Sequence, residues 1–264
     1  MTRASLVFLA LIITVTSPVL AASPPPPLEN LKQQMTTRHA GVPPTSWGEN
    51  VPGVRTRLDT DDMVIALTLD ACGSAGGKGV DSRLVEFLIR EQIPATLFIN
   101  GRWIDANSDL FRQLAANPLF EIANHGARHK PLSVSGRSVY GIAGTQNSAE
   151  VVEEIEMNAR KIEAVNGVRP KLFRSGTAYY DEIAVQIAQE LGYEVAGYSL
   201  LGDAGATWSA ALVKAALLKA TPGDIALLHM NHPEAGTGAG IMAAVPDLKK
   251  RGFRFVRMSE YPLK

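Results

Sequence analysis

Short apolar segments alternate with longer amphipathic segments from Met63 to the end of the chain. Strands that alternate with helices in this way form parallel βα units with right-handed crossovers. The chain is therefore predicted to be an α/β protein. Seven strands can close into a barrel or form an open sheet, and the periodicity does not distinguish the two. The pattern predicts strands at 63–69, 95–99, 119–123, 171–173, 193–198, 224–228 and 253–257, and helices at 81–91, 103–116, 148–165, 180–191, 207–219 and 239–250.

The N-terminal segment has the composition of a targeting signal. Arg3 precedes an apolar stretch from Leu6 to Val15, which is short for a membrane span, and small residues follow at Ala21 and Ala22. This predicts a signal peptide at 1–22 and an exported chain, periplasmic or secreted, with no membrane span after cleavage. An uncleaved membrane anchor is the alternative.

A second segment separates this signal from the alternating region. Residues 23–62 are predicted to form a proline-rich linker and an irregular lead-in, with one short helix near 28–37. The catalytic domain is then predicted at 63–264.

The charge balance narrows the class of partner. Lys and Arg together number 26, as do Asp and Glu, so no global field attracts nucleic acid or an acidic membrane. Aromatic residues make up only 6%, which argues against a base-stacking surface. We expect no nucleic-acid partner, and we expect a monomer.

Polar side chains stand at the ends of three predicted strands. Asp70 ends the first strand, His125 and His129 follow the third, and His229 and His232 follow the sixth. The carboxyl ends of parallel strands meet on one face, so these side chains are expected to lie together. Two histidines four residues apart can reach one ion, and with a carboxylate they suit Zn²⁺ or another divalent first-row metal. Two solvated loop histidines are the plainer explanation of the pair alone.

Cys72 is the only cysteine, so no internal disulfide can form. Its position beside Asp70 allows two interpretations, a nucleophile or a small buried residue that fills space under a loop. We favour the second, because no base in the sequence is evidently dedicated to the thiol. Residues 130–147 are rich in Gly, Ser and Thr and predict a long loop that forms part of one wall of the site.

Five segments resemble, in the right order, the motifs of polysaccharide deacetylases, the NodB-like domain of carbohydrate esterase family four. They are Leu69-Asp70-Ala71-Cys72-Gly73, the His125 to His129 segment, Phe173-Arg174-Ser175-Gly176, the segment that ends at Asp203, and the strand that ends in Leu228-His229. The resemblance implies a distorted (β/α)7 barrel. It also implies metal-dependent hydrolysis of acetyl groups, chiefly N-acetyl amides, on an acetylated polysaccharide or oligosaccharide.

The resemblance also implies a role for each matching residue. His125 and His129 would be metal ligands, Asp70 the catalytic base, Arg174 the arginine that orients it, Asp203 the aspartate that holds the arginine, and His229 the general acid. The implied ion is Zn²⁺, with Co, Ni or Mn as alternatives. The loop from Thr177 to Tyr180 would supply a backbone N–H to the oxyanion.

One departure leaves the role of Asp70 open. The family pattern has a second aspartate as metal ligand, and this chain has Ala71 there. Asp70 then binds the metal itself, or remains the base while the two histidines and another group hold the ion, or the site is inactive. His232 is one candidate for a further imidazole. The alternatives to a deacetylase are an inactive carbohydrate-binding protein and a metal-dependent amidase that acts on a small amide.

Overall fold

The structure is a computed structural model that describes residues 25–264. The predicted signal peptide at 1–22 and the first residues of the predicted linker lie outside this range. Within it, no helix combines the length and the apolar character that crossing a bilayer requires.

The seven predicted strands are all present. They are β3 (Val64–Ala71), β4 (Ala95–Ile99), β5 (Phe120–Asn124), β8 (Leu172–Phe173), β10 (Glu194–Ala196), β12 (Asp224–His229) and β13 (Arg254–Val256). Six further strands of two residues each were not predicted. They are β1 (Trp47–Gly48), β2 (Val54–Arg55), β6 (Ser138–Val139), β7 (Ile142–Ala143), β9 (Tyr180–Asp181) and β11 (Leu200–Leu201).

The predicted helices are also present, and the segment 103–116 is divided in two. Asn107 separates its halves, and its side chain donates to the carbonyl groups of Lys78 and Trp103. The helices are α1 (Leu28–Arg38), α2 (Ser82–Arg90), α3 (Gly101–Ala106), α4 (Ser108–Ala116), α5 (Ser148–Asn166), α6 (Glu182–Glu190), α7 (Ala210–Leu217) and α8 (Thr237–Lys250). A single 3-10 turn, Met258–Glu260, follows β13.

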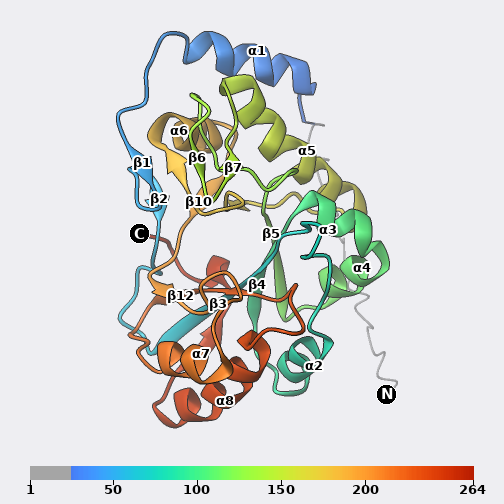
Figure 1. The fold of residues 1–264 in the computed structure, drawn as a ribbon, viewed down its shortest axis with the longest axis vertical. Coiled ribbons are helices and arrows are strands. Elements are labelled where there is room, and N and C mark those ends of the chain that lie inside the picture. The colour runs from blue at the N-terminus through green and yellow to red at the C-terminus, as the bar shows by residue number, and fades with distance from the viewer. Residues whose placement is uncertain (1–24) are drawn as a thin grey trace, which may run out of the picture.

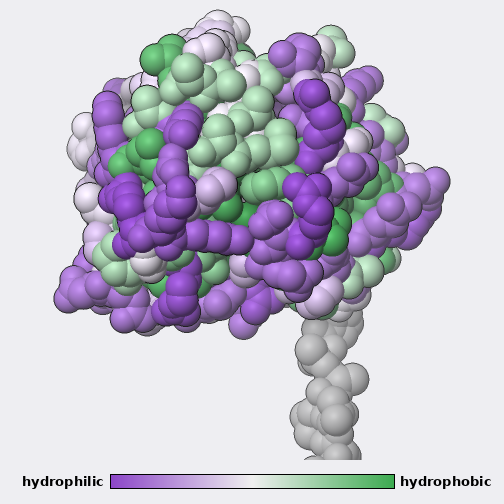
Figure 2. Space-filling view, turned by 90° about the horizontal axis from the view of Figure 1, so that it is seen from below, coloured by the Kyte–Doolittle hydropathy of each residue, from purple (hydrophilic) through white to green (hydrophobic). Residues whose placement is uncertain are grey.

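The main sheet is parallel and strongly curled. Its strand order is β11-β12-β3-β4-β5-β8-β10-β2, and β13 pairs with the first part of β3. Within residues 25–264 no pairing joins β11 to β2, so the sheet forms an open, distorted barrel, as expected. Helices surround the sheet, with α2, α7 and α8 on one side of the molecule and α1, α5 and α6 on the other (Figure 1). The face seen in Figure 2 is mixed, with hydrophilic residues along its lower and left parts and weakly hydrophobic residues in the upper middle.

Strand β3 is buried along its whole length, and its residues alternate between two cores. Ile65, Leu67, Leu69 and Ala71 pack in the large core between the sheet and the helices. Val64 and Ala66 pack in a smaller core inside the barrel. Successive side chains of a strand point to opposite faces, so Thr68 and Asp70 also point into the barrel.

Candidate active site

Asp70 is buried at the end of β3 and is paired with Arg174, which follows β8. One guanidinium nitrogen of Arg174 donates to Asp70 Oδ1 at 2.8 Å and to Thr68 Oγ1 at 2.9 Å. A second nitrogen donates to the carbonyl of Gly197 at 2.8 Å, and the guanidinium lies 4.1 Å from the centre of the Phe98 ring. These contacts fix the arginine, and the arginine fixes the orientation of the carboxylate.

His125, His129 and Cys72 form a second group beside this pair. One ligand atom from each of the three residues lies within 4.8 Å of the other two, and the Cys72 Sγ to His125 Nε2 distance is 3.8 Å. His125 Nδ1 lies 3.0 Å from the carbonyl oxygen of Arg174. A carbonyl only accepts, so Nδ1 carries a proton, and Nε2 is the ring atom that faces Cys72. Asp70 Oδ2 lies 3.6 Å from the same Nε2 but is not part of the group of three.

The chemistry of this group suits a metal ion. Burial raises the pKa of the Cys72 thiol, but His129, His125 and His229 together lower it by more, so that pKa lies well below its usual value. The Nε2 atom of His129 is buried and has no hydrogen-bond partner among the described residues. Buried polar atoms in folded proteins are nearly always satisfied. A ligand set of one thiolate and two imidazoles fits a divalent ion such as zinc.

The segment that carries His129 is held by a buried carboxylate. Glu154 of α5 accepts from the backbone N–H groups of Arg128 and Lys130. A Cβ on Gly126 would lie 2.3 Å from the Glu154 carboxylate, and one on Gly176 would lie 2.3 Å from the backbone of His129. The close packing of these two glycines places His129, whose φ is 62°, against the loop after Arg174.

His229 ends β12 and is paired with Asp203. Its Nδ1 lies 2.9 Å from Asp203 Oδ1, and its backbone N–H donates to Oδ2 at 2.8 Å. Burial lowers the pKa of His229, but the hydrogen bonds and negative charges of Asp203 and Cys72 together outweigh burial, so that pKa lies well above its usual value. Asp203 was expected to hold Arg174. That expectation is wrong, because its side chain contacts His229 and Thr237 instead.

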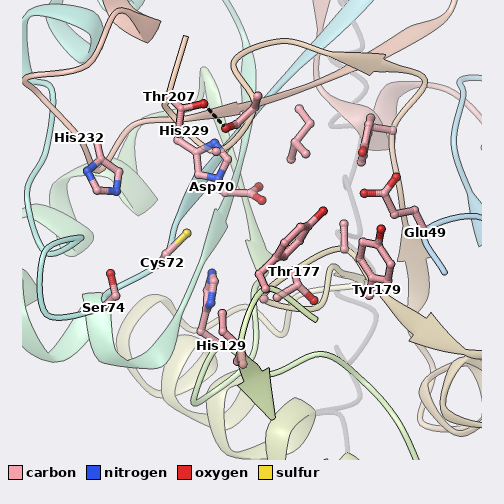
Figure 3. A pocket seen from close by; sticks show the side chains of 18 of the residues that line it. Glu49, Asp70, Cys72, Ser74, His129, Thr177, Tyr179, Thr207, His229 and His232 are labelled. Atoms are coloured by element: carbon pink, nitrogen blue, oxygen red, sulfur yellow. Dashed lines mark hydrogen bonds between the residues drawn. The ribbon is translucent and has the colours of Figure 1, made fainter. Parts of the chain in front are cut away.

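A cavity of about 940 Å³ opens over these groups. Its lining includes Asp70 and Cys72 from the end of β3 and the residue after it, His129 from the loop after β5, and His229 from the end of β12, which project toward one space (Figure 3). His232 also lines the cavity, but its Nδ1 pairs with Glu234 at 2.9 Å, and the residue is not in the ligand group.

One wall of the cavity is formed by segments outside the main sheet. Tyr140 and Ile142 of the β6–β7 hairpin line it, so residues 130–147 do form part of a wall. Glu49 of the lead-in and Tyr179 line it as well, and the rings of Tyr140 and Tyr179 are 5.7 Å apart in an edge-to-face arrangement.

A family model, that of polysaccharide deacetylases, matches residues 57–196. The chain belongs to the polysaccharide deacetylase family. Among its relatives is the peptidoglycan-N-acetylglucosamine deacetylase of Bacillus cereus, 26% identical over 212 residues, which are 78% of this chain and 92% of the relative.

Solved structures of this deacetylase family share the fold. A family 4 carbohydrate esterase, PdaA, from Bacillus subtilis aligns with a TM-score of 0.64 at 17% identity, and 87% of each chain is covered. A pseudoenzyme of the same esterase family from Bacillus anthracis aligns with a TM-score of 0.67 at 20% identity, covering 80% of this chain and 69% of that one. Likeness at this identity establishes the fold and leaves activity open.

Cys72 was expected to be a small buried residue that fills space under a loop rather than a nucleophile. The structure instead places its sulfur beside His125 and His129. The signal was present in the sequence, because residues two apart in an extended segment share a face, and Cys72 is two residues after Asp70. Glu49 and Glu154 were not predicted to belong to the site.

Proposed function

We propose that this chain is an exported, metal-dependent deacetylase that hydrolyses N-acetyl amides of a polysaccharide or oligosaccharide. The observation that carries the proposal is the pairing of Asp70 with Arg174 and of His229 with Asp203, at the ends of the neighbouring strands β3 and β12, in the cavity that Cys72 and His129 also line. Membership in the family and the N-terminal composition support the activity class and the export.

The two pairs divide the proton transfers between a base and an acid. Asp70, held by Arg174, accepts a proton from the water that attacks the acetyl carbonyl. His229, whose pKa is raised by Asp203 and Cys72, is favoured in its protonated form and gives its proton to the leaving nitrogen. The C–N bond then breaks, and the products are acetate and a free amine.

Two parts of the site would stabilise the negative charge that develops on the acetyl oxygen. They are the Cys72, His125 and His129 group, when it holds an ion, and the loop that follows Arg174. Cys72, His125 and His129 would hold a divalent ion, and a bound ion would act as a Lewis acid toward the acetyl carbonyl. Thr177 lines the cavity, and its buried hydroxyl has no partner among the described residues. A hydroxyl so placed is a ready donor to the substrate oxygen.

The experiment is a screen for acetate release from peptidoglycan, chitin oligomers and acetylxylan, with and without added Zn²⁺. We expect zinc-dependent release from at least one N-acetylated polymer. His229→Ala should bind as much metal as the wild type and release acetate about 10²- to 10⁴-fold more slowly. His125→Ala should lose the metal, as elemental analysis would show. Equal metal content in His125→Ala and wild type contradicts the ligand assignment.

An inactive carbohydrate-binding protein is the second candidate. The presence of Ala71, where the family pattern has a second aspartate, favours it. The intact acid and base pairs favour a working enzyme. Saturable binding of a glycan without acetate release from any polymer, even with zinc, would decide for the inactive protein.

An amidase that acts on a small amide is the third candidate. The wall formed by Tyr140, Ile142 and Glu49 favours it, because this wall limits the cavity on one side. Release of acetate from single acetylated sugars or small amides, with none from polymers, would select this candidate.

A further inference from the structure

Ala71, the last residue of β3, and Cys72, which follows the strand, lie in different surroundings. Ala71 is fully buried in the core between the sheet and the helices. Cys72 lines the cavity, as does Asp70 two residues earlier. A side chain at position 71 would have to leave that core to reach His125 and His129. Position 72 already faces them.

We propose that Cys72 is the third protein ligand of the metal ion, so that its thiolate stands where relatives use a carboxylate. The inference rests on the metal dependence in the proposed function. It also assigns Asp70 to the base role alone, which the sequence left open.

The distances fit a tetrahedral ion. Zinc lies about 2.3 Å from sulfur and about 2.0 Å from imidazole nitrogen, so neighbouring ligand atoms are roughly 3.5 Å apart. The Cys72 Sγ to His125 Nε2 distance is 3.8 Å, and all three ligand atoms are within 4.8 Å of one another. Three protein ligands leave the fourth position open, as in catalytic zinc sites.

The hydrogen bonds around the group favour the same assignment. Metal-bound histidines usually donate the second ring N–H to a carbonyl or carboxylate, and His125 Nδ1 does so to the carbonyl of Arg174. His129 Nε2 is buried without a hydrogen-bond partner in the described part of the chain. An ion at this point would satisfy both imidazoles.

The Asp70 carboxylate and the Cys72 thiolate have different charge partners. The Asp70 carboxylate is already matched by the Arg174 guanidinium at 2.8 Å, with both side chains buried. With neutral histidines, the thiolate is then the anionic ligand that partly offsets the charge of the ion. A thiolate also selects zinc or cobalt over magnesium or manganese, which prefer oxygen.

The test is the absorption spectrum of the full chain loaded with Co²⁺. A thiolate ligand produces an intense near-ultraviolet charge-transfer band, and Cys72 is the only cysteine that can supply it. We expect this band to grow in proportion to bound Co²⁺ up to one equivalent. Stoichiometric cobalt binding without the band overturns the inference, whatever the activity.

Two variants of the same residue form matched controls. Cys72→Ser should weaken Co²⁺ binding by more than about 100-fold, since changes outside the ligand shell already cost 10- to 100-fold. Cys72→Asp should recover binding without the band and accept Mn²⁺ better than the wild type does. Unchanged Co²⁺ affinity in Cys72→Ser contradicts the ligand role. If a variant misfolds by circular dichroism, the wild-type spectrum still decides.

A nucleophilic thiol is the competing role for Cys72. Bound zinc should protect the ligand thiol from iodoacetamide, and no acetyl adduct should form on it. An acetylated Cys72, detected by mass spectrometry after substrate is added, overturns the inference. Acetate release without the charge-transfer band contradicts the ligand role of Cys72 and leaves the proposed function standing. The band without acetate release supports the ligand role and contradicts the proposed function.

Discussion

The Asp203 carboxylate accepts from three groups at once. They are the His229 backbone N–H, the His229 ring and the Thr237 hydroxyl. Burial raises the pKa of Asp203, but the hydrogen bonds from His229 and Thr237 and the charge of His229 together lower it below its usual value. An ionised Asp203 favours the imidazolium form of His229, which is the form that a general acid requires.

Asp203→Asn should lower the pKa of His229, because the amide removes the negative charge that offsets burial. The rate falls as His229 loses its proton, so the descending basic limb of the pH–rate profile should move to lower pH. The measurement is kcat/KM across pH for the zinc-loaded enzyme. Glu234→Gln is the matched control, since Glu234 pairs with His232, and its profile should stay in place. An unmoved basic limb in Asp203→Asn would show that His229 is not the acid.

At the scale of elements, successive side chains at the end of β3 and just after it point to opposite faces, and this decides which of them reach the cavity. Asp70 and Cys72 face it, and Ala71 faces the helices. Replacing one neighbour by another in such a strand moves a side chain to the opposite face. A carboxylate at position 71 is therefore not equivalent to a ligand at position 72.

Ala71→Asp should destabilise the protein by about 3 kcal/mol or more, because it buries an unpaired carboxylate among apolar side chains. Ala71→Ser, the uncharged control, should cost about 1–2 kcal/mol. Urea unfolding measures both. Two results together would show that position 71 reaches the ion. They are wild-type stability of Ala71→Asp, and metal binding by the double variant Ala71→Asp, Cys72→Ala where Cys72→Ala alone binds none.

Helix α5 supports the site through Glu154. Burial raises the pKa of this carboxyl to about 7, against the N–H groups of Lys130 and Arg128, which lower it. Between the ordinary value of 4.5 and about 7 the folded chain holds a proton that the unfolded chain has lost. Stability therefore falls as pH rises through this interval.

Glu154→Gln should flatten that dependence, since the amide oxygen still accepts from the loop but does not titrate. In the wild type, the rise of the Glu154 pKa from 4.5 to about 7 corresponds to a loss of about 3 kcal/mol in the free energy of unfolding across this interval. Glu154→Gln should not show that loss. Urea midpoints measured from about pH 5 to about pH 8 compare the two proteins. Parallel curves for wild type and Glu154→Gln would assign the pH dependence to other groups.

The sequence predicts the long elements better than the short ones. Apolar runs such as 64–71 and 224–229 are strands by their own composition, and each is buried on both faces. The two-residue strands β1, β2 and β11 carry no such signal, because they form only when a distant strand pairs with them. The break at Asn107 depends in part on a bond to Lys78, which is likewise nonlocal.

At the scale of the whole molecule, the barrel brings together groups that are far apart in sequence. Asp70, His125, His129 and His229 were expected to meet because parallel strands end on one face, and the structure places them around one region. The partner of Asp203 and the role of Cys72 depend on how loops and strand faces meet. Motif order alone does not contain that information.

The central claim is that Asp70 serves as the base of a zinc-dependent deacetylase. The most direct test measures acetate released from N-acetylated chitin oligomers by chelator-treated protein after zinc is returned, for wild type and Asp70→Asn. We predict that the wild type regains activity, and that Asp70→Asn binds equal zinc but is slower by about 10²- to 10⁴-fold. Equal rates in the two proteins, or no acetate from the zinc-loaded wild type, would contradict the account.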